Sequence, residues 1–151
     1  MTADQPTGPV DYVVIELSGS VEPTRTSQAI LDLVDRGTVR LFDVVVVRKA
    51  SDGSVEVVGP TADGPGAIAG LTDLAWAHSG LIDDDDVQDA GAALEPGRLA
   101  VIILYENTWA VPFVAAALED GGELVASGRV PAEAVEDALD SLERTATDRK
   151  V

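Results

Sequence analysis

The run Leu-Ala-Val-Ile-Ile-Leu-Tyr at residues 99–105 constrains the fold more than any other part of this chain. Such an uninterrupted apolar run, rich in β-branched residues, is typical of a strand that is buried on both faces. The apolar stretch continues to residue 118, but Glu106, Asn107 and Thr108 interrupt it, so we do not expect a membrane span. We expect instead a central strand, followed by a helix over residues 108–120.

The rest of the chain divides into further strands and helices. Short β-branched or alternating runs predict strands at residues 12–17, 39–49, 54–58 and 123–129. Apolar spacing and capping residues predict four more helices. One ends at Gly37, one spans residues 66–79, one runs from Asp83 to Pro96, and one begins at Pro131. The order is therefore βαβ, a hairpin with a helical insertion, a second βαβ unit at residues 99–129, and a trailing helix.

Two βαβ units with right-handed crossovers predict an α+β fold, the ferredoxin-like split βαβ sandwich. Its core would be an antiparallel four-stranded sheet, with a hairpin/helical insertion and a C-terminal helix. A length of 151 residues fits a single domain over residues 1–151. Within it we expect a flexible N-terminus at residues 1–10, the helical insertion at 59–97 and a frayed tail at 145–151.

Charge and cysteine content limit which binding partners and which cellular location the chain is expected to have. The chain has 10 Lys and Arg against 27 Asp and Glu, a formal net charge of −17. This charge repels nucleic-acid phosphates and anionic lipids, so we expect no nucleic-acid and no membrane partner. The same net charge is equally consistent with a high-salt environment and with a basic protein partner. Cysteine is absent, which excludes disulfides, and polar residues 1–10 lack a signal-peptide pattern, which favours a cytoplasmic location.

We expect no catalytic residues, no cofactor-binding residues and no metal-binding residues in this chain. The glycine-rich residues 64–70 match neither a phosphate loop nor a dinucleotide fingerprint. His78 is the only histidine, and we expect it near a helix end, where a protonated imidazole suits the helix dipole. The acidic run at residues 83–86 lacks the calcium-loop pattern, and Asp83 is better interpreted as a helix N-cap.

The strand–helix junction holds the candidate ligand or interface contacts, Glu106, Asn107 and Trp109. Ligands of α/β folds often bind where strands end and helices begin. The competing interpretation is structural: Asn107 or Thr108 caps the helix, and Trp109 packs over the sheet edge. Separately, Arg48 and Arg129 stand at strand ends, from which they could form surface ion pairs with Glu16 or Glu106.

Four strings carry a resemblance to a known family: GPVDYVVIEL at residues 8–17, LVDRGTVRLFDVVVVRKASDGSV at 33–55, AALEPGRLAVIILYENTWAVPF at 92–113 and GGELVASGRVPAEAV at 121–135. They resemble a small bacterial domain-of-unknown-function family, found mostly in high-GC Gram-positive species. That family is similar to a wider one in which two βαβ halves flank a Gly/Ala-rich helical zipper. The resemblance implies a fold but no activity. In this chain the zipper region is short and contains Asp63, Asp73 and His78, unlike a membrane-associated zipper.

These observations favour a non-enzymatic module that associates with itself, most simply as a dimer, or with another protein. A split βαβ sheet leaves edge strands, and the β-branched run at residues 44–47 needs burial on both faces. The trailing helix or a second copy would supply the missing cover. The alternative is a small-ligand-binding or sensor domain that uses Glu106, Asn107 and Trp109. An enzyme is not favoured, because the sequence shows no nucleophile–base pair, metal cluster or phosphate loop.

Overall fold

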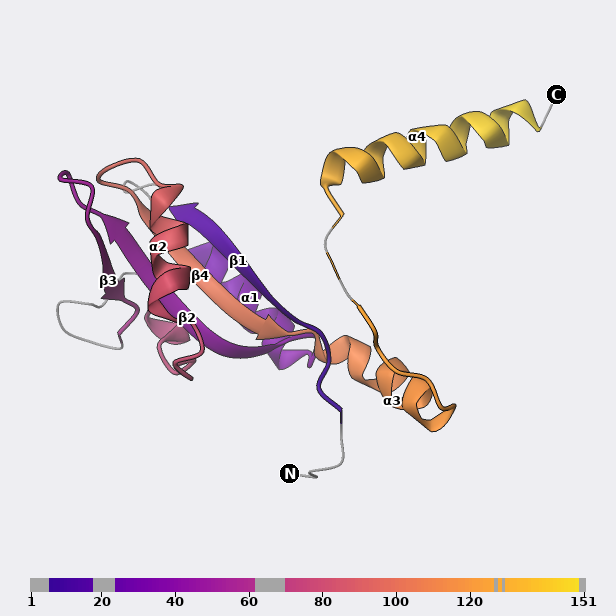
Figure 1. Ribbon diagram of the computed structural model, residues 1–151, viewed down its shortest axis with the longest axis horizontal. Coiled ribbons are helices and arrows are strands. Elements are labelled where there is room, and N and C mark those ends of the chain that lie inside the picture. Colours follow the sequence, from indigo (N-terminus) through magenta and orange to yellow (C-terminus); the bar gives the residue numbers. More distant parts are fainter. Residues whose placement is uncertain (1–5, 18–23, 62–69, 127, 129, 150–151) are drawn as a thin grey trace.

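The protein forms one antiparallel sheet with helices on both faces. The computed structural model describes residues 6–17, 24–61, 70–126, 128 and 130–149. Its strands are β1 (Val10–Leu17), β2 (Arg40–Lys49), β3 (Val55–Gly59) and β4 (Leu99–Glu106). They lie in the order β1-β4-β2-β3, and every neighbouring pair is antiparallel. The predicted α+β class, the four-stranded antiparallel sheet and the central place of residues 99–105 are therefore confirmed (Figure 1).

Two helices cover the sheet, one on each face. They are α1 (Thr24–Asp35), which connects β1 to β2, and α2 (Asp84–Ala92), which precedes β4. Figure 1 shows α2 in front of the sheet and α1 behind it. Each helix joins two parallel strands that have an antiparallel strand between them. Two split βαβ units, β1-α1-β2 and β3-α2-β4, are therefore interleaved in a single sheet.

The alternating side chains of β4 explain why its sequence is apolar without interruption. Val101 and Ile103 belong to the core cluster on the α1 side, together with Val46 of β2. Ala100 and Ile102 belong to the cluster on the α2 side, together with Val47. All six residues are buried. A strand in the middle of three layers has no solvent-facing side, so a polar residue at any of these positions would need a buried partner.

The ferredoxin-like arrangement is not confirmed. The expected sandwich has both helices on one face of its sheet, whereas α1 and α2 pack against opposite faces. The second βαβ unit is also not the one expected at residues 99–129. The described part of residues 123–129 contains no strand, and β4 pairs with β1 on one side and β2 on the other. The hairpin strand β3 and helix α2 supply the second unit instead.

The helix expected at residues 66–79 is wrong over the part that the structure describes, residues 70–79. This part holds only the single 3₁₀ turn η1 (Thr72–Leu74). Leu71 and Leu74 are fully buried on the α1 side, and this three-residue apolar spacing resembled a helix. The chain then follows the edge of β2, where the Val44 N–H donates to the Ala77 carbonyl at 2.9 Å. Residues 62–69 lie outside the described part.

Two more helices follow β4. The 3₁₀ turn η2 (Thr108–Ala110) leads into α3 (Val111–Glu119), and α4 (Ala132–Asp148) is the expected C-terminal helix. Helix α4 extends to Asp148, and a frayed tail at residues 145–151 stays a prediction. In Figure 1, α4 stands away from the sheet, and every one of its residues is exposed. Among the described residues, no helix combines the length and the apolar character needed to cross a membrane.

Candidate functional site

Glu106, the last residue of β4, is a buried carboxylate that joins three segments. Its side chain is 3% exposed. Oε2 accepts a hydrogen bond from the backbone N–H of Gly8 at 2.7 Å, and Oε1 lies 3.0 Å from Nε of Arg40. Arg40 begins β2 and stands directly opposite Glu106 in the β2–β4 register. Glu106 therefore ties the N-terminal segment and β2 to the end of the central strand.

Asn107 continues this network toward β1 and Trp109. Its Nδ2 donates to the Pro9 carbonyl at 3.0 Å and to Oδ2 of Asp11 at 2.9 Å. Its Oδ1 accepts the indole N–H of Trp109 at 3.1 Å. The structure thus brings the three candidate residues together, with the polar side-chain atoms of each engaged inside the chain. Sequence reasoning missed Gly8 and Arg40; only strand pairing indicates that Arg40 opposes Glu106.

The details of the junction differ from the structural interpretation. Neither Asn107 nor Thr108 caps the helix through its side chain, and the Thr108 hydroxyl oxygen is buried with no hydrogen-bond partner among the described residues. Trp109 lies in η2, before the first turn of α3. Its ring packs on Phe113, with centroids 5.9 Å apart, and the residue is 58% exposed. Trp109 therefore presents much of its indole at the surface.

A cavity of about 630 Å³ opens beside this junction, between α1 and the sheet. Val13 and Ile15 of β1 and Ile103 of β4 form its floor, and Ile30 and Leu33 of α1 form a wall. Further lining residues are Arg25, Thr26, Ala29, Thr38, Val39, Leu41, Tyr105, Asn107 and Trp109. Its volume lies within the range of roughly 300 to 1,000 Å³ that is typical of small-molecule sites.

The acidic run begins α2 as expected. Asp83 is the N-cap, its side chain accepts from the Asp86 N–H at 2.9 Å, and the Asp86 side chain accepts from the Asp83 N–H at 3.1 Å. This reciprocal capping box accounts for two of the four carboxylates. Within the described ranges, no three His, Asp or Glu side chains are grouped so that they could hold a metal ion.

His78 does not lie at a helix end. It pairs with Asp43 in an isolated β-bridge, and its Nδ1 is 3.9 Å from Oδ1 of Asp43. The Asp43 carboxylate is fully buried, and its Oδ2 accepts from the Ile82 N–H at 2.9 Å. Asp43 therefore fixes the segment that crosses from the α1 face to the α2 face.

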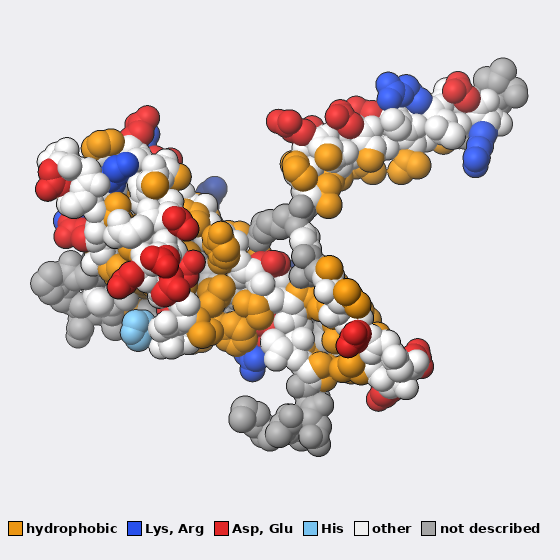
Figure 2. Space-filling view, in the orientation of Figure 1, with side chains coloured by type: hydrophobic (Ala, Val, Ile, Leu, Met, Phe, Trp, Pro, Cys, Tyr) orange, Lys and Arg blue, Asp and Glu red, His pale blue; other side chains and the backbone are white. Residues whose placement is uncertain are grey.

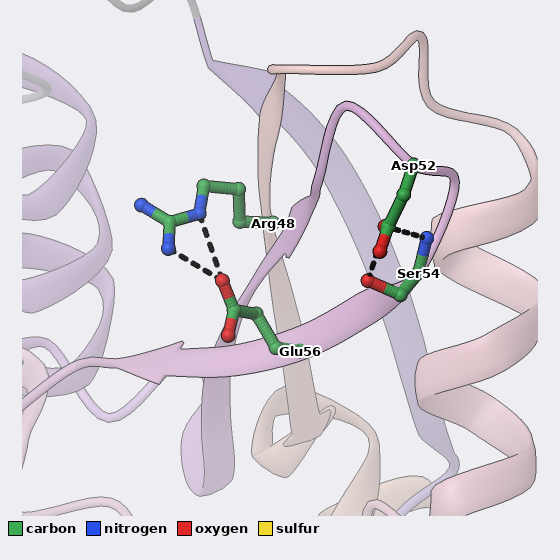
Figure 3. Close-up of polar contacts among 4 residues, drawn as sticks. All are labelled: Arg48, Asp52, Ser54 and Glu56. Atoms are coloured by element: carbon green, nitrogen blue, oxygen red, sulfur yellow. Dashed lines mark hydrogen bonds and ion pairs between the residues drawn. The ribbon is translucent and has the colours of Figure 1, made fainter.

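The β2–β3 hairpin carries a separate polar cluster on the surface (Figure 3). Arg48 forms an ion pair with Glu56 on the neighbouring strand. At the turn, Oδ1 of Asp52 accepts from the Ser54 hydroxyl at 2.6 Å and from the Ser54 N–H at 2.9 Å. These hydrogen bonds hold the pKa of the Asp52 carboxyl below its usual value, and the bond from the Ser54 hydroxyl has the larger effect.

The ion pairs on the surface differ from those considered for Arg48 and Arg129. Arg48 pairs with Glu56, and the partner of Glu16 is Arg98, at 3.3 Å. Arg129 lies outside the described residues. These pairs are exposed, and such pairs contribute at most about 1 kcal/mol to stability. Their contribution to stability is therefore small.

Comparison with known proteins gives one match. No curated protein and no solved structure matches the chain. A family model described as a family of unknown function, DUF6325, matches residues 6–146, which include almost the whole sheet-and-helix assembly. The resemblance carried by the four strings also pointed to a family of unknown function, and this match agrees with it on that point. The chain therefore belongs to the family of unknown function DUF6325.

Proposed function

We propose that this protein is a non-enzymatic module that associates with a second copy of itself through its C-terminal arm, here defined as α3 and α4. The observation that carries the proposal is the exposure of α4. It is a helix of 17 residues, every residue of which is exposed. Most helices in proteins owe their stability to packing of an apolar face rather than to intrinsic helix propensity.

The apolar face of α4 is well defined. Val135, Leu139 and Leu142 follow one another at spacings of four and three residues, so they form one stripe along the helix. Their exposed fractions are 43, 54 and 66%. Figure 2 shows apolar side chains gathered along one side of α4 and acidic side chains along the other. This distribution is expected of a helix that packs against another apolar surface.

The same arm offers such a surface. Phe113 and Leu118 of α3 are about half exposed, and Leu124 beyond α3 is exposed to a similar extent. In a twofold dimer each copy presents the same surfaces, so the α4 stripe of one copy can cover α3 of the other, and the reverse. This self-complementarity within one arm favours a second copy over an unrelated partner. One symmetric contact would thereby remove the apolar surfaces of α3 and α4 in both copies from water.

The charge of the chain predicts how this association responds to salt. Two copies that each carry a formal charge of −17 repel each other. Added salt screens that repulsion over a distance of about 10 Å at 0.1 M, while it leaves apolar burial in place. Association through the arm should therefore strengthen as salt concentration rises. A contact built on ion pairs would weaken over the same range.

The test is a pair of variants that add the same charge to opposite sides of α4. Leu139→Glu places a carboxylate in the apolar stripe, whereas Ser141→Glu places one on the polar side. Sedimentation velocity should give a monomer for Leu139→Glu and leave the association of Ser141→Glu close to that of the unmodified chain. Circular dichroism checks that both variants keep their sheet. Equal association of the two variants would contradict the proposal.

The alternative function, a small-ligand-binding or sensor domain built on Glu106, Asn107 and Trp109, has less support. Both oxygens of Glu106, both polar atoms of Asn107 and the indole N–H of Trp109 already have partners in the chain. A ligand would have to displace these contacts to use the same atoms. Direct binding through these three residues stays a prediction.

A further inference from the structure

The cavity between α1 and the sheet has properties that self-association through the arm does not use. Its floor and wall are aliphatic, contributed by Val13, Ile15, Ile30, Leu33 and Ile103. Apolar side chains that line an open cavity of about 630 Å³ remain in contact with water. An apolar molecule that filled the cavity would remove that contact from both surfaces.

The polar groups of the cavity are not evenly distributed. Arg25 and Thr26 line it from the first turn of α1, while Asn107 and Trp109 line it from the opposite end of the sheet. Arg25 and Leu33 are eight residues apart on α1, which is about 12 Å along a helix. The cavity is therefore elongated, with a cation near one end and an indole ring near the other.

Arg25 is a candidate binding group because nothing in the described part of the chain neutralises it. The other arginine of α1, Arg36, pairs with Asp32 at 3.3 Å. Arg25 has neither an ion pair nor a hydrogen-bond partner among the described residues. The first turn of α1 reads Thr-Arg-Thr-Ser, without an acidic side chain. In a chain with 27 acidic residues, Arg25 is thus a cation without a carboxylate partner in the described ranges.

We propose that this cavity binds an elongated apolar molecule that carries one anionic group, with the apolar part between α1 and the strands β1 and β4 and the anionic group at Arg25. A guanidinium binds a carboxylate through charge-assisted hydrogen bonds. The hydroxyl groups of Thr26 and Thr38 are further donors along the lining. The overall negative charge does not prevent this contact, because salt screens distant charges more strongly than adjacent ones.

The experiment uses decanoate as the probe, below the concentration at which it forms micelles, and decan-1-ol as its uncharged analogue. The full chain carries Trp76→Phe, so that Trp109 at the end of the cavity is its only tryptophan. Decanoate should change the Trp109 emission in a saturable manner, with one molecule bound per chain. Arg25→Gln should weaken decanoate binding about tenfold or more, as expected for loss of a charged hydrogen bond, and leave decan-1-ol binding within about twofold.

Two further variants establish where the probe binds. Ala29→Phe should fill the cavity and abolish the emission change with both probes, and Thr26→Phe serves the same purpose if the first variant fails to fold. Ala92→Phe on α2 adds the same ring to an exposed position outside the cavity lining and should leave binding unchanged. Repeating the titration with Leu139→Glu separates this site from self-association, and the affinity should not change.

Three results would overturn the proposal. The first is the absence of a saturable change with decanoate at any concentration tested. The second is an Arg25→Gln variant that binds decanoate as well as the parent does, which would remove the anionic group from the ligand. The third is undiminished binding to a folded Ala29→Phe or Thr26→Phe variant, which would place the probe elsewhere, including on an apolar surface covered by a second copy.

Discussion

Arg40 and Glu106 stand opposite each other on β2 and β4, and the Nε atom of Arg40 lies 3.0 Å from a carboxylate oxygen that is almost fully buried. The arginine is half exposed, and its guanidinium also lies 4.9 Å from the ring centre of Phe42. The pair therefore joins a solvated cation to a desolvated anion. Removal of the cation would leave the Glu106 carboxylate with only the Gly8 N–H as a partner among the described residues.

Arg40→Ala should lower the free energy of unfolding by about 2 kcal/mol, the magnitude expected for a lost hydrogen bond to a charged group. Arg36→Ala is the matched control, because its partner Asp32 is exposed, and it should cost less than about 0.5 kcal/mol. Urea unfolding followed by circular dichroism measures both. Equal losses in the two variants would show that burial of Glu106 does not strengthen the pair.

Gly91→Ala should destabilise the protein by about 1 to 3 kcal/mol, although alanine favours helices more than glycine does. A Cβ atom at Gly91 of α2 would overlap the side chain of Val55 on β3. Val55→Ala should therefore recover part of the loss in the double variant, which a thermodynamic cycle from urea unfolding would detect. Strictly additive effects would mean that α2 does not approach β3 this closely.

Ser54→Ala should raise the pKa of Asp52 toward its usual value, because the hydroxyl donor is lost and the backbone N–H donors of Ser54 and Asp52 remain. A lowered pKa in the folded state contributes stability that is present above the unfolded-state pKa and is lost as pH falls through the folded-state pKa. The substitution should therefore flatten the acid limb of the stability curve. Carboxyl NMR titration measures the pKa directly, with Ser51→Ala as a control that leaves it unchanged.

Trp109→Ala should lower the free energy of unfolding by about 1 kcal/mol when it is measured in the monomeric Leu139→Glu background. A large aromatic side chain removed from a core costs roughly 3 to 5 kcal/mol, but Trp109 is 58% exposed and keeps one hydrogen bond and one ring contact. Thermal or urea unfolding distinguishes these values. A loss near 3 kcal/mol in the monomer would show that the ring is buried within a single chain.

Sequence patterns predicted the elements whose surroundings are encoded locally. The apolar run of β4, the β-branched run of β2, the glycine that ends the α1 region and the acidic cap of α2 each have a local cause. Residues 123–129 show where such patterns fail. Alternation suggested a strand, but a strand forms only where its backbone pairs with a neighbouring strand, and the alternation of residues 123–129 does not specify such a partner.

The candidate site shows the same limit. Glu106, Asn107 and Trp109 were found because they stand where a buried strand ends. Their structural partners could not be inferred, because Gly8 and Pro9 lie about a hundred residues earlier and reach the junction only when β1 pairs with β4. The cavity beside them also depends on how α1 lies over the sheet, which residue spacing within α1 does not determine.

The mass of the unmodified full chain in solution, measured by light scattering coupled to chromatography at salt concentrations from about 0.05 to 0.5 M, tests self-association through the arm most directly. We expect a mass near twice 15.7 kDa, with the dimer increasingly populated as salt rises. A mass of 15.7 kDa at every salt and protein concentration would contradict the account, and dissociation of a dimer by added salt would contradict an apolar contact.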